Sequence, residues 1–386
     1  MPVTGGTAEL ARSATPGHLL ALIRTRPQWT RRELLDATGM SRPTLLERLA
    51  PLFAAGLIHG AGSSPSDGGR PAQLIRFDDR SMAVLTFDVG HTHGRVGVTG
   101  VHGRELRSAT LRLDLATTGP DEVLAALTAA AAELTRPQER LVGVGVGLPG
   151  PISPATGLPG ASTVLRRWEG FPVLDRLRAR WDVPLVLEND ARAFALGEAS
   201  VQPDSVLLGV KWASGIGAGV VSDGRSLAGA DGAAGDIGHI RVDPAGPLCR
   251  CGRRGCLAAY ASGYALCSST SVGSIEELAD RSFDPRVRGL LEAAARRVGE
   301  VLAALIALVN PRTLVLGGAL GELPAVVSTV DQMVREIAMP HSTDGLRIVP
   351  SRLAGRAATA GLVDLVVRRV LDPEAVDRSL AASPAS

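Results

Sequence analysis

Residues 232–256 read GAAGDIGHIRVDPAGPLCRCGRRGC and hold three of the four cysteines of the chain. A histidine and these cysteines follow the spacing H-x9-C-x-C-x4-C. The candidate ligands are His239, Cys249, Cys251 and Cys256. Three thiolates and one imidazole complete a tetrahedral zinc site, so we predict one structural zinc ion with no open coordination position. The alternative is three unrelated free cysteines. Cys267 lies outside the group, and we interpret it as a buried free thiol.

Outward from this stretch, strand-like and helix-like segments alternate between residues 82 and 371. The expected strands cover residues 83–87, 141–146, 185–187, 206–210 and 313–316, and the clearest helices cover 122–134 and 290–308. Alternation of this kind predicts α/β layers with a mixed sheet. Two glycine-rich turns, at 88–90 and 214–219, each lie beside a strand, and we therefore expect two similar lobes.

Six motifs in this region belong together. They are DVGHT at 88–92, GVGVGLPGP at 143–151, ENDA at 188–191, SGIGAG at 214–219, GAAGDIGH at 232–239 with its cysteines, and NP at 310–311 followed by LGG at 316–318. From about residue 85 to about residue 320 the chain thus resembles the ROK family of repressors and sugar kinases. The resemblance implies an α/β, two-lobed, actin-like ATPase (ribonuclease H-like) fold of the sugar-kinase type.

The resemblance also implies where a sugar would bind. In the kinase members, an aspartate at the position of Asp190 takes the proton from the sugar hydroxyl, and the neighbouring Asn189 holds the sugar. His239 would contact sugar as well as metal, and Asp236 completes the expected effector site. The expected nucleotide-loop residues are Asp88, Gly90, Thr92, Ser214, Gly215, Gly317 and Gly318. The alternative interpretation is that the glycines are retained only as turns of the fold.

Three positions depart from the kinase pattern. His91 replaces the second glycine of Asp-x-Gly-Gly-Thr, where an imidazole should crowd bound phosphates. Asp236 replaces the usual glutamate, and Ala258 replaces a sugar-binding glutamate outright. Loss of a hydrogen-bonding carboxylate costs about 1.5–3 kcal/mol of ligand affinity. We therefore expect Asp190 to be vestigial as a catalytic base, and we expect neither ATP nor magnesium to serve as a cofactor.

Upstream, residues 30–56 have the spacing of a helix-turn-helix. Thr30 and Glu33 form a capping box, Gly39 ends that helix, and Ser41 caps the next one, which stops at Gly56. Two expected strands, at 57–58 and 74–77, enclose the glycine-rich loop 62–71. These elements predict a winged helix-turn-helix over residues 16–80, and the pattern resembles the N-terminus of ROK repressors down to the GGRP sequence of the wing.

This module has a local net charge of +3, since residues 16–80 contain nine arginines and six acidic residues. The first turns of a recognition helix enter the major groove, and a wing arginine can enter a minor groove or contact phosphate. The expected DNA-binding residues are Ser41, Arg42, Thr44, Arg48 and Arg70. The alternative is a three-helix bundle that makes protein contacts.

The composition sets outer limits. The 386 residues exceed one typical domain, and the net charge of +2 is too small to mark the whole protein as a nucleic-acid binder. The segment 301–309 is too short to span a bilayer, and the start lacks a secretory pattern, so we expect a cytoplasmic protein. We divide the chain into a loose tail (1–15), the winged helix (16–80), the sugar-kinase-like domain (81–372) and a C-terminal tail (373–386).

These features predict a DNA-binding transcriptional regulator, a repressor, controlled by a sugar or sugar-phosphate effector. A homodimer or homotetramer would bind an inverted-repeat, double-stranded operator. The alternative is an active ATP-dependent sugar kinase with an appended helix-turn-helix, favoured by Asp88, Thr92 and Asp190 and opposed by His91 and Ala258. A third interpretation, a scaffold without a ligand, leaves the retained sugar-binding pair unexplained.

Overall fold

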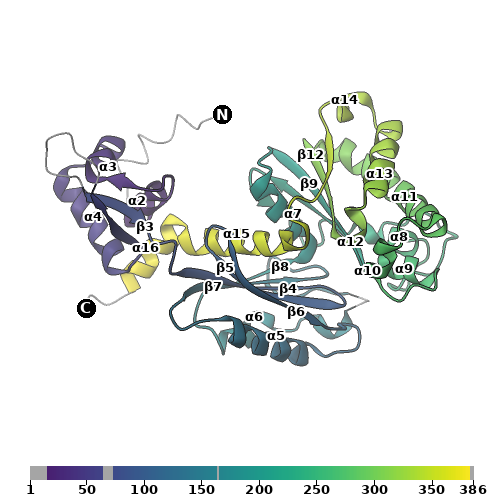
Figure 1. Cartoon of the computed structure of the whole chain (residues 1–386), viewed down its shortest axis with the longest axis horizontal. Helices are drawn as coiled ribbons and strands as arrows, with labels where there is room; N and C mark the ends of the chain where they lie inside the picture. The colour runs from purple at the N-terminus through teal and green to yellow at the C-terminus, as the bar shows by residue number, and fades with distance from the viewer. Residues whose placement is uncertain (1–14, 64–72, 163–164, 383–386) are drawn as a thin grey trace.

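The computed structural model describes residues 15–63, 73–162 and 165–382. It has three sheets, one in an N-terminal module and one in each of two larger lobes (Figure 1). The expected loose tail falls almost wholly outside the described residues, and so does most of the expected wing loop, including Arg70. No helix in the described ranges is long and apolar enough to cross a membrane.

The N-terminal module consists of three helices and a small antiparallel sheet. The helices are α2 (Pro16–Ile23), α3 (Arg31–Thr38) and α4 (Arg42–Ala54). The strands β1 (Trp29–Thr30), β2 (Ile58–Ser63) and β3 (Gln73–Phe77) pair in the order β1-β3-β2. Leu20, Leu34 and Ile75 are fully buried at the centre of the module. The helix-turn-helix order expected from the sequence is therefore present, with one additional strand, β1.

The predicted helix ends of this module are confirmed. Thr30 Oγ1 accepts from the backbone N–H of Glu33 at 3.2 Å, and a Glu33 carboxylate oxygen accepts from the Thr30 N–H at 2.6 Å. Gly39 ends α3 with a φ of 66°, a left-handed conformation that favours glycine. Ser41 caps α4 by accepting from the N–H of Thr44.

The first lobe is built on the sheet β6-β5-β4-β7-β8. Its strands are β4 (Met82–Val89), β5 (His93–Gly100), β6 (Glu105–Arg112), β7 (Arg140–Leu148) and β8 (Leu185–Asn189). Strands β4, β7 and β8 are parallel, whereas β5 and β6 are antiparallel to their neighbours. Helices α5 (Pro120–Leu134) and α6 (Val173–Arg178) cover one face, and α15 (Ala357–Leu371) covers the other (Figure 1).

The second lobe is built on the sheet β11-β10-β9-β12-β13. Its strands are β9 (Val206–Trp212), β10 (Ile216–Ser222), β11 (Arg225–Ser226), β12 (Thr313–Gly317) and β13 (Arg347–Pro350). Helix α7 (Asp190–Val201) packs on one face, and α11 (Pro285–Val309) and α13 (Pro324–Ile337) contribute to the core on the other. Side chains of successive strand residues point to opposite faces of the sheet and so pack in different cores. Leu207 packs in the core with α7, and Leu208 packs in the core with α11.

Shorter elements complete the second lobe and its connections. They are α8 (Leu257–Ala261), α9 (Gly263–Ser268), α10 (Ile275–Asp280), α12 (Gly318–Gly321) and α14 (Pro340–Thr343), with the 3-10 turns η1 (Arg166–Trp168), η2 (Ile237–His239) and η3 (Ala354–Arg356).

The segment 214–219, predicted as a glycine-rich turn, is a strand over most of its length. Residues from Ile216 onward form β10, which pairs antiparallel with β9. A Cβ on Gly219 would lie 2.7 Å from the Cβ of Ala195, so the glycine allows α7 to lie directly against the strand. The prediction was wrong because Gly217 and Gly219 allow close packing of α7 on the strand, and closely packed glycines give the same sequence signal as a turn.

Helices α7 and α15 cross at two glycines. A Cβ on Gly197 would lie 1.8 Å from the carbonyl oxygen of Ala357, and a Cβ on Gly361 would lie 1.9 Å from the carbonyl oxygen of Ala193. The two helices therefore pack backbone to backbone. Because α15 also covers the first sheet and α7 the second, this crossing joins the two lobes.

The predicted C-terminal tail is instead a helix over most of its length, so that prediction was wrong. Helix α16 (Pro373–Ala382) packs against α2 at the far end of α15 (Figure 1). Asp377 Oδ1 accepts from the N–H of Gly17 at 2.8 Å, and Val376 is buried. One apolar core runs from the N-terminal module through Leu371 and Val376 into the first lobe. The helix escapes sequence analysis because it is short and its few apolar residues gain their partners only from α2 and the lobe.

Candidate functional site

A cavity of about 930 Å³ is lined by residues of both lobes. The first lobe contributes the loops after β4 and β7, and the second contributes the start of α7, the end of β9 and the loop around η2. All four predicted effector residues lie on its wall: Asn189, Asp190, Asp236 and His239. The structure therefore brings together the residues that the sequence motifs assigned to a sugar.

Asn189 uses its side chain to fix the start of α7. Its Oδ1 accepts from the backbone N–H groups of Ala191 and Arg192, both at 3.0 Å, and its Nδ2 donates to the carbonyl oxygen of Gly150 at 2.9 Å. An N-cap of this kind satisfies two helix-end donors and holds the next residue in place. That next residue is Asp190, which is thus held at the cavity wall by a loop of the first lobe.

Lys211 also lines the cavity, and sequence reasoning did not include it among the candidate site residues. Its Nζ lies 3.0 Å from Asp190 Oδ2 and 3.6 Å from Asp88 Oδ1. Burial alone would lower the pKa of Lys211, but the two carboxylates outweigh it and raise that pKa above its ordinary value. One signal was available: every other residue among the 41 lysines and arginines of the chain is arginine.

His91 also lines the cavity, beside Tyr264, with 6.0 Å between the ring centroids. Burial lowers the pKa of His91 to about 4, and the positive charges of Arg250 and Lys211 act in the same direction against the opposing effect of Asp190. Its Nδ1 is buried without a hydrogen-bond partner within the described part of the chain. A neutral imidazole thus occupies the loop position where the kinase pattern has a glycine.

The predicted nucleotide-loop residues fall into two groups. Gly90, Ser214 and Gly215 line the cavity, and Asp88 lies behind them, 5% exposed. The other three are Thr92, Gly317 and Gly318, which do not line it. Thr92 is exposed in the turn after β4, and both glycines pack closely, Gly317 on the ring of Phe194 and Gly318 on the backbone of Trp212.

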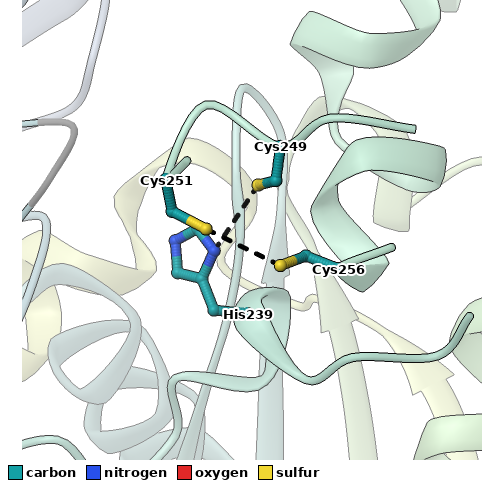
Figure 2. A group of neighbouring side chains, drawn as sticks. All are labelled: His239, Cys249, Cys251 and Cys256. Carbon is teal, nitrogen blue, oxygen red and sulfur yellow. Dashed lines mark hydrogen bonds between the residues drawn. The ribbon is translucent and has the colours of Figure 1, made fainter. Parts of the chain in front are cut away.

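The histidine and three cysteines of the sequence motif meet at one point beside the cavity (Figure 2). Their ligand atoms all lie within 4.8 Å of one another. Cys249 Sγ is 3.7 Å from His239 Nδ1, and Cys251 Sγ is 3.6 Å from Cys256 Sγ. Three sulfurs and one imidazole nitrogen at this spacing could hold a metal ion. Cys267 is a free thiol outside the group, but it is half-buried rather than buried.

The loop that carries these ligands is held by its own backbone. The N–H of Cys249 donates to the carbonyl oxygen of Arg253 at 2.7 Å, and the N–H of Gly252 donates back to Cys249 at 2.9 Å. Burial would raise the pKa of Cys251, but hydrogen bonds from Arg253 lower it to about 6. Burial raises the pKa of Cys249, and it raises that of Cys256 to about 12. A thiolate at neutral pH is the form that binds metal.

The same loop forms part of the cavity wall. Arg250, between two of the cysteines, lies over the ring of Tyr264 with its Cζ 4.1 Å from the centroid. Both residues line the cavity, as does Ala258, which brings no carboxylate to the wall. A metal ion that orders the loop would therefore also order this side of the cavity.

In the N-terminal module, the predicted DNA-binding residues differ in their exposure and in their hydrogen bonds. Arg42 is exposed on the first turn of α4, whereas the Ser41 and Thr44 hydroxyls bond each other at 2.8 Å. Arg48 is half-buried, and its Nε has no hydrogen-bond partner among the residues described. Of the two arginines among these four, Arg42 is the more exposed.

The chain has an actin-like, sugar-kinase-type body with an N-terminal winged helix. The features that define this class are two lobes around a shared cavity, an adjoining loop of candidate metal ligands and a docked helix-turn-helix. Residues 84–369 match the ROK family, and the chain belongs to that family. It is 30% identical to the glucokinase of Thermotoga maritima over 318 residues, which are 75% of this chain and 98% of that protein. It is 25% identical to the DNA-binding transcriptional dual regulator NagC of Escherichia coli, over 95% of both chains.

A solved structure has the same fold over nearly the whole length. It is a crystal structure of a ROK family transcriptional regulator, a homologue of the Escherichia coli MLC protein, with a TM-score of 0.77 and 23% identity. The likeness covers 95% of this chain and 98% of that chain, so the N-terminal module and the body have the fold of that regulator.

Proposed function

We propose that this protein is a DNA-binding transcriptional repressor whose operator affinity is controlled by a sugar or sugar phosphate bound in the cavity between the lobes. The main support for this proposal is that the kinase and the regulator match different lengths of the chain. The glucokinase is covered over 98% of its length by three quarters of this chain, whereas the regulator NagC matches 95% of both. The family match begins at residue 84, so the additional part lies mainly in the N-terminal module.

The packing supports a route from the cavity to the module. Helix α7 starts at Asp190 in the cavity wall and crosses α15, and α15 leads into α16, which packs on α2. A ligand that binds one relative position of the lobes better than another shifts the balance between them. Because packed helices move as rigid elements, such a shift would reposition the helix-turn-helix.

On DNA, we propose that α4 lies in the major groove with Arg42 toward the bases. A symmetric homodimer or homotetramer would present two such helices to the halves of an inverted repeat. We also propose that the metal is zinc with a structural role, because three thiolates and one imidazole leave no coordination position open. It would hold the loop of Arg250 against the ligand.

The proposal is tested with genomic fragments selected by the full chain and by a variant lacking residues 1–80. The full chain should enrich a fragment with an inverted repeat, and the shortened chain should not. In parallel, sugars and sugar phosphates are screened for those that raise the melting temperature of both proteins. The same compounds should release the enriched fragment from the full chain. An unchanged footprint after deletion of residues 1–80 would contradict the proposal.

The rival function is an ATP-dependent sugar kinase, favoured by the identity to the glucokinase and by the place of Asp190 in the cavity wall. Phosphoryl transfer depends on positioning and charge stabilisation, and His91 stands in the loop that would receive phosphate. We expect no turnover with hexoses, pentoses or N-acetyl sugars. His91→Gly alone should restore little, whereas His91→Gly with Ala258→Glu should restore some. Rapid turnover by the unmodified protein would favour the kinase.

A further inference from the structure

Two carboxylates, Asp88 and Asp190, lie within ion-pair distance of Lys211. Asp88 lies near the end of β4 in the first sheet, and Asp190 is the first residue of α7, which packs on the second sheet. Their side chains are only 7% and 18% exposed. Paired carboxylates in a partly buried site are the oxygen ligands that Mg²⁺ and similar hard cations take.

The position between the two carboxylates is taken by Lys211. Its ammonium contacts both, and its side chain is 17% exposed. The backbone of Lys211 is fixed on both sides, because β9 pairs there with Gly217 of β10 and with Gly317 of β12. The raised pKa keeps the ammonium charged. Lys211 is thus a permanent cation in a fixed place.

The residue type matters as much as the charge. A lysine ammonium is a compact point charge, whereas an arginine guanidinium is a broad planar fork. This chain uses arginine at every other strongly basic position, yet it has lysine where a small cation must fit between two carboxylates.

We propose that Lys211 is a built-in cation that takes the place of a divalent metal ion between Asp88 and Asp190, so that the cavity binds its ligand without magnesium or a magnesium–nucleotide complex. A divalent cation entering this space would meet the Lys211 ammonium, which donates a hydrogen bond to Asp190 Oδ2 at 3.0 Å. The same ammonium lies 3.6 Å from Asp88 Oδ1, an oxygen that has no hydrogen-bond partner among the described residues, and it would repel the incoming cation. The residues present therefore do not fit a magnesium-bound nucleotide. This inference concerns the ion chemistry of the cavity, and it stands or falls separately from the proposed repressor function.

The test uses Mn²⁺ alone, titrated into the full-length, zinc-loaded protein and followed by the electron paramagnetic resonance signal of the free ion. Lys211→Met keeps the length of the side chain and removes its charge. It should bind one additional Mn²⁺ at least about tenfold more tightly than the wild type, because charge repulsion is replaced by two free carboxylates. The matched control, Lys211→Met with Asp88→Asn, should lose that gain. A folded Lys211→Met protein that gains no Mn²⁺ site would overturn the proposal.

A second measurement needs no change at Lys211. The melting temperature of the wild type should be the same in MnCl2 as in NaCl of equal ionic strength. An increase in MnCl2 that disappears in Asp88→Asn would place a divalent ion at these carboxylates beside the lysine, and it would also overturn the proposal.

Discussion

Gly17, in the first turn of α2, packs against the start of the C-terminal helix α16. A Cβ at this position would lie 2.0 Å from the carbonyl oxygen of Pro373, and contacts under 3.0 Å are essentially never seen. Gly17→Ala therefore forces α16 away from α2 by about 1 Å. The shift also stretches the hydrogen bond from the Gly17 N–H to Asp377.

The expected cost follows from these contacts. Overpacking costs about 1–3 kcal/mol, and a lost hydrogen bond to a charged group costs about 1.5–3 kcal/mol. Alanine in a helix is otherwise favoured over glycine by about 0.5–1 kcal/mol. The balance predicts that Gly17→Ala lowers the free energy of unfolding by about 1.5–5.5 kcal/mol. The ligand-dependent change in operator affinity should shrink with it, because α16 no longer couples the module to the lobes.

The matched control is Gly289→Ala in α11, where a Cβ meets nothing within 4 Å. This variant should be more stable than the wild type by about 0.5–1 kcal/mol. Urea unfolding measures both free energies, and fluorescence anisotropy with a labelled operator measures the coupling. If Gly17→Ala proved as stable as Gly289→Ala, the described docking of α16 on α2 would be wrong.

Three further predictions concern the metal, pH and DNA. Cys251→Ser should reduce the metal content from one zinc per chain to almost none and lower the melting temperature, as elemental analysis and calorimetry would measure; equal stability without metal would count against a structural role. Because burial holds the pKa of His91 near 4 rather than 6.5, stability should fall as the pH drops from about 6.5 to about 4, by no more than about 3.4 kcal/mol. His91→Phe should remove that part of the pH dependence, and an unchanged pH profile would contradict it. Arg42→Ala should weaken specific operator binding by about 1–3 kcal/mol, whereas Arg70→Ala should weaken binding to all DNA sequences alike. The opposite pattern would mean that Arg70 reads the bases and Arg42 contacts the phosphates.

The fold was predictable where one segment carries its own signal. The capping box at Thr30 and the N-cap at Ser41 lie within single helical turns, and the buried strands of both lobes are apolar runs. Strands β5 and β6 were missed because glycine, arginine and threonine interrupt their apolar pattern. Helix α16 was missed because its stability comes from contacts with α2, at the other end of the chain.

The candidate site follows the same rule. The four metal-ligand candidates were found because they lie within one short stretch, and Asp190 was found because its neighbours form a motif. Lys211 was missed because its role depends on Asp88, which lies on another strand of another lobe. Gly317 and Gly318 were assigned to a nucleotide loop, yet side-chain and backbone packing accounts for both.

The central claim is that ligand binding between the lobes controls DNA binding by the N-terminal module. The most direct measurement is the operator affinity of the full chain, by fluorescence anisotropy at fixed salt, with and without the sugar or sugar phosphate that most raises its melting temperature. We predict that this compound weakens operator binding at least about tenfold. A change of this size lies within the range of affinity changes, about 5–150-fold, that typical coupling free energies produce. The compound should remain unphosphorylated in the presence of ATP. Operator affinity that is unchanged at saturating ligand, or rapid phosphorylation of that ligand, would contradict the account.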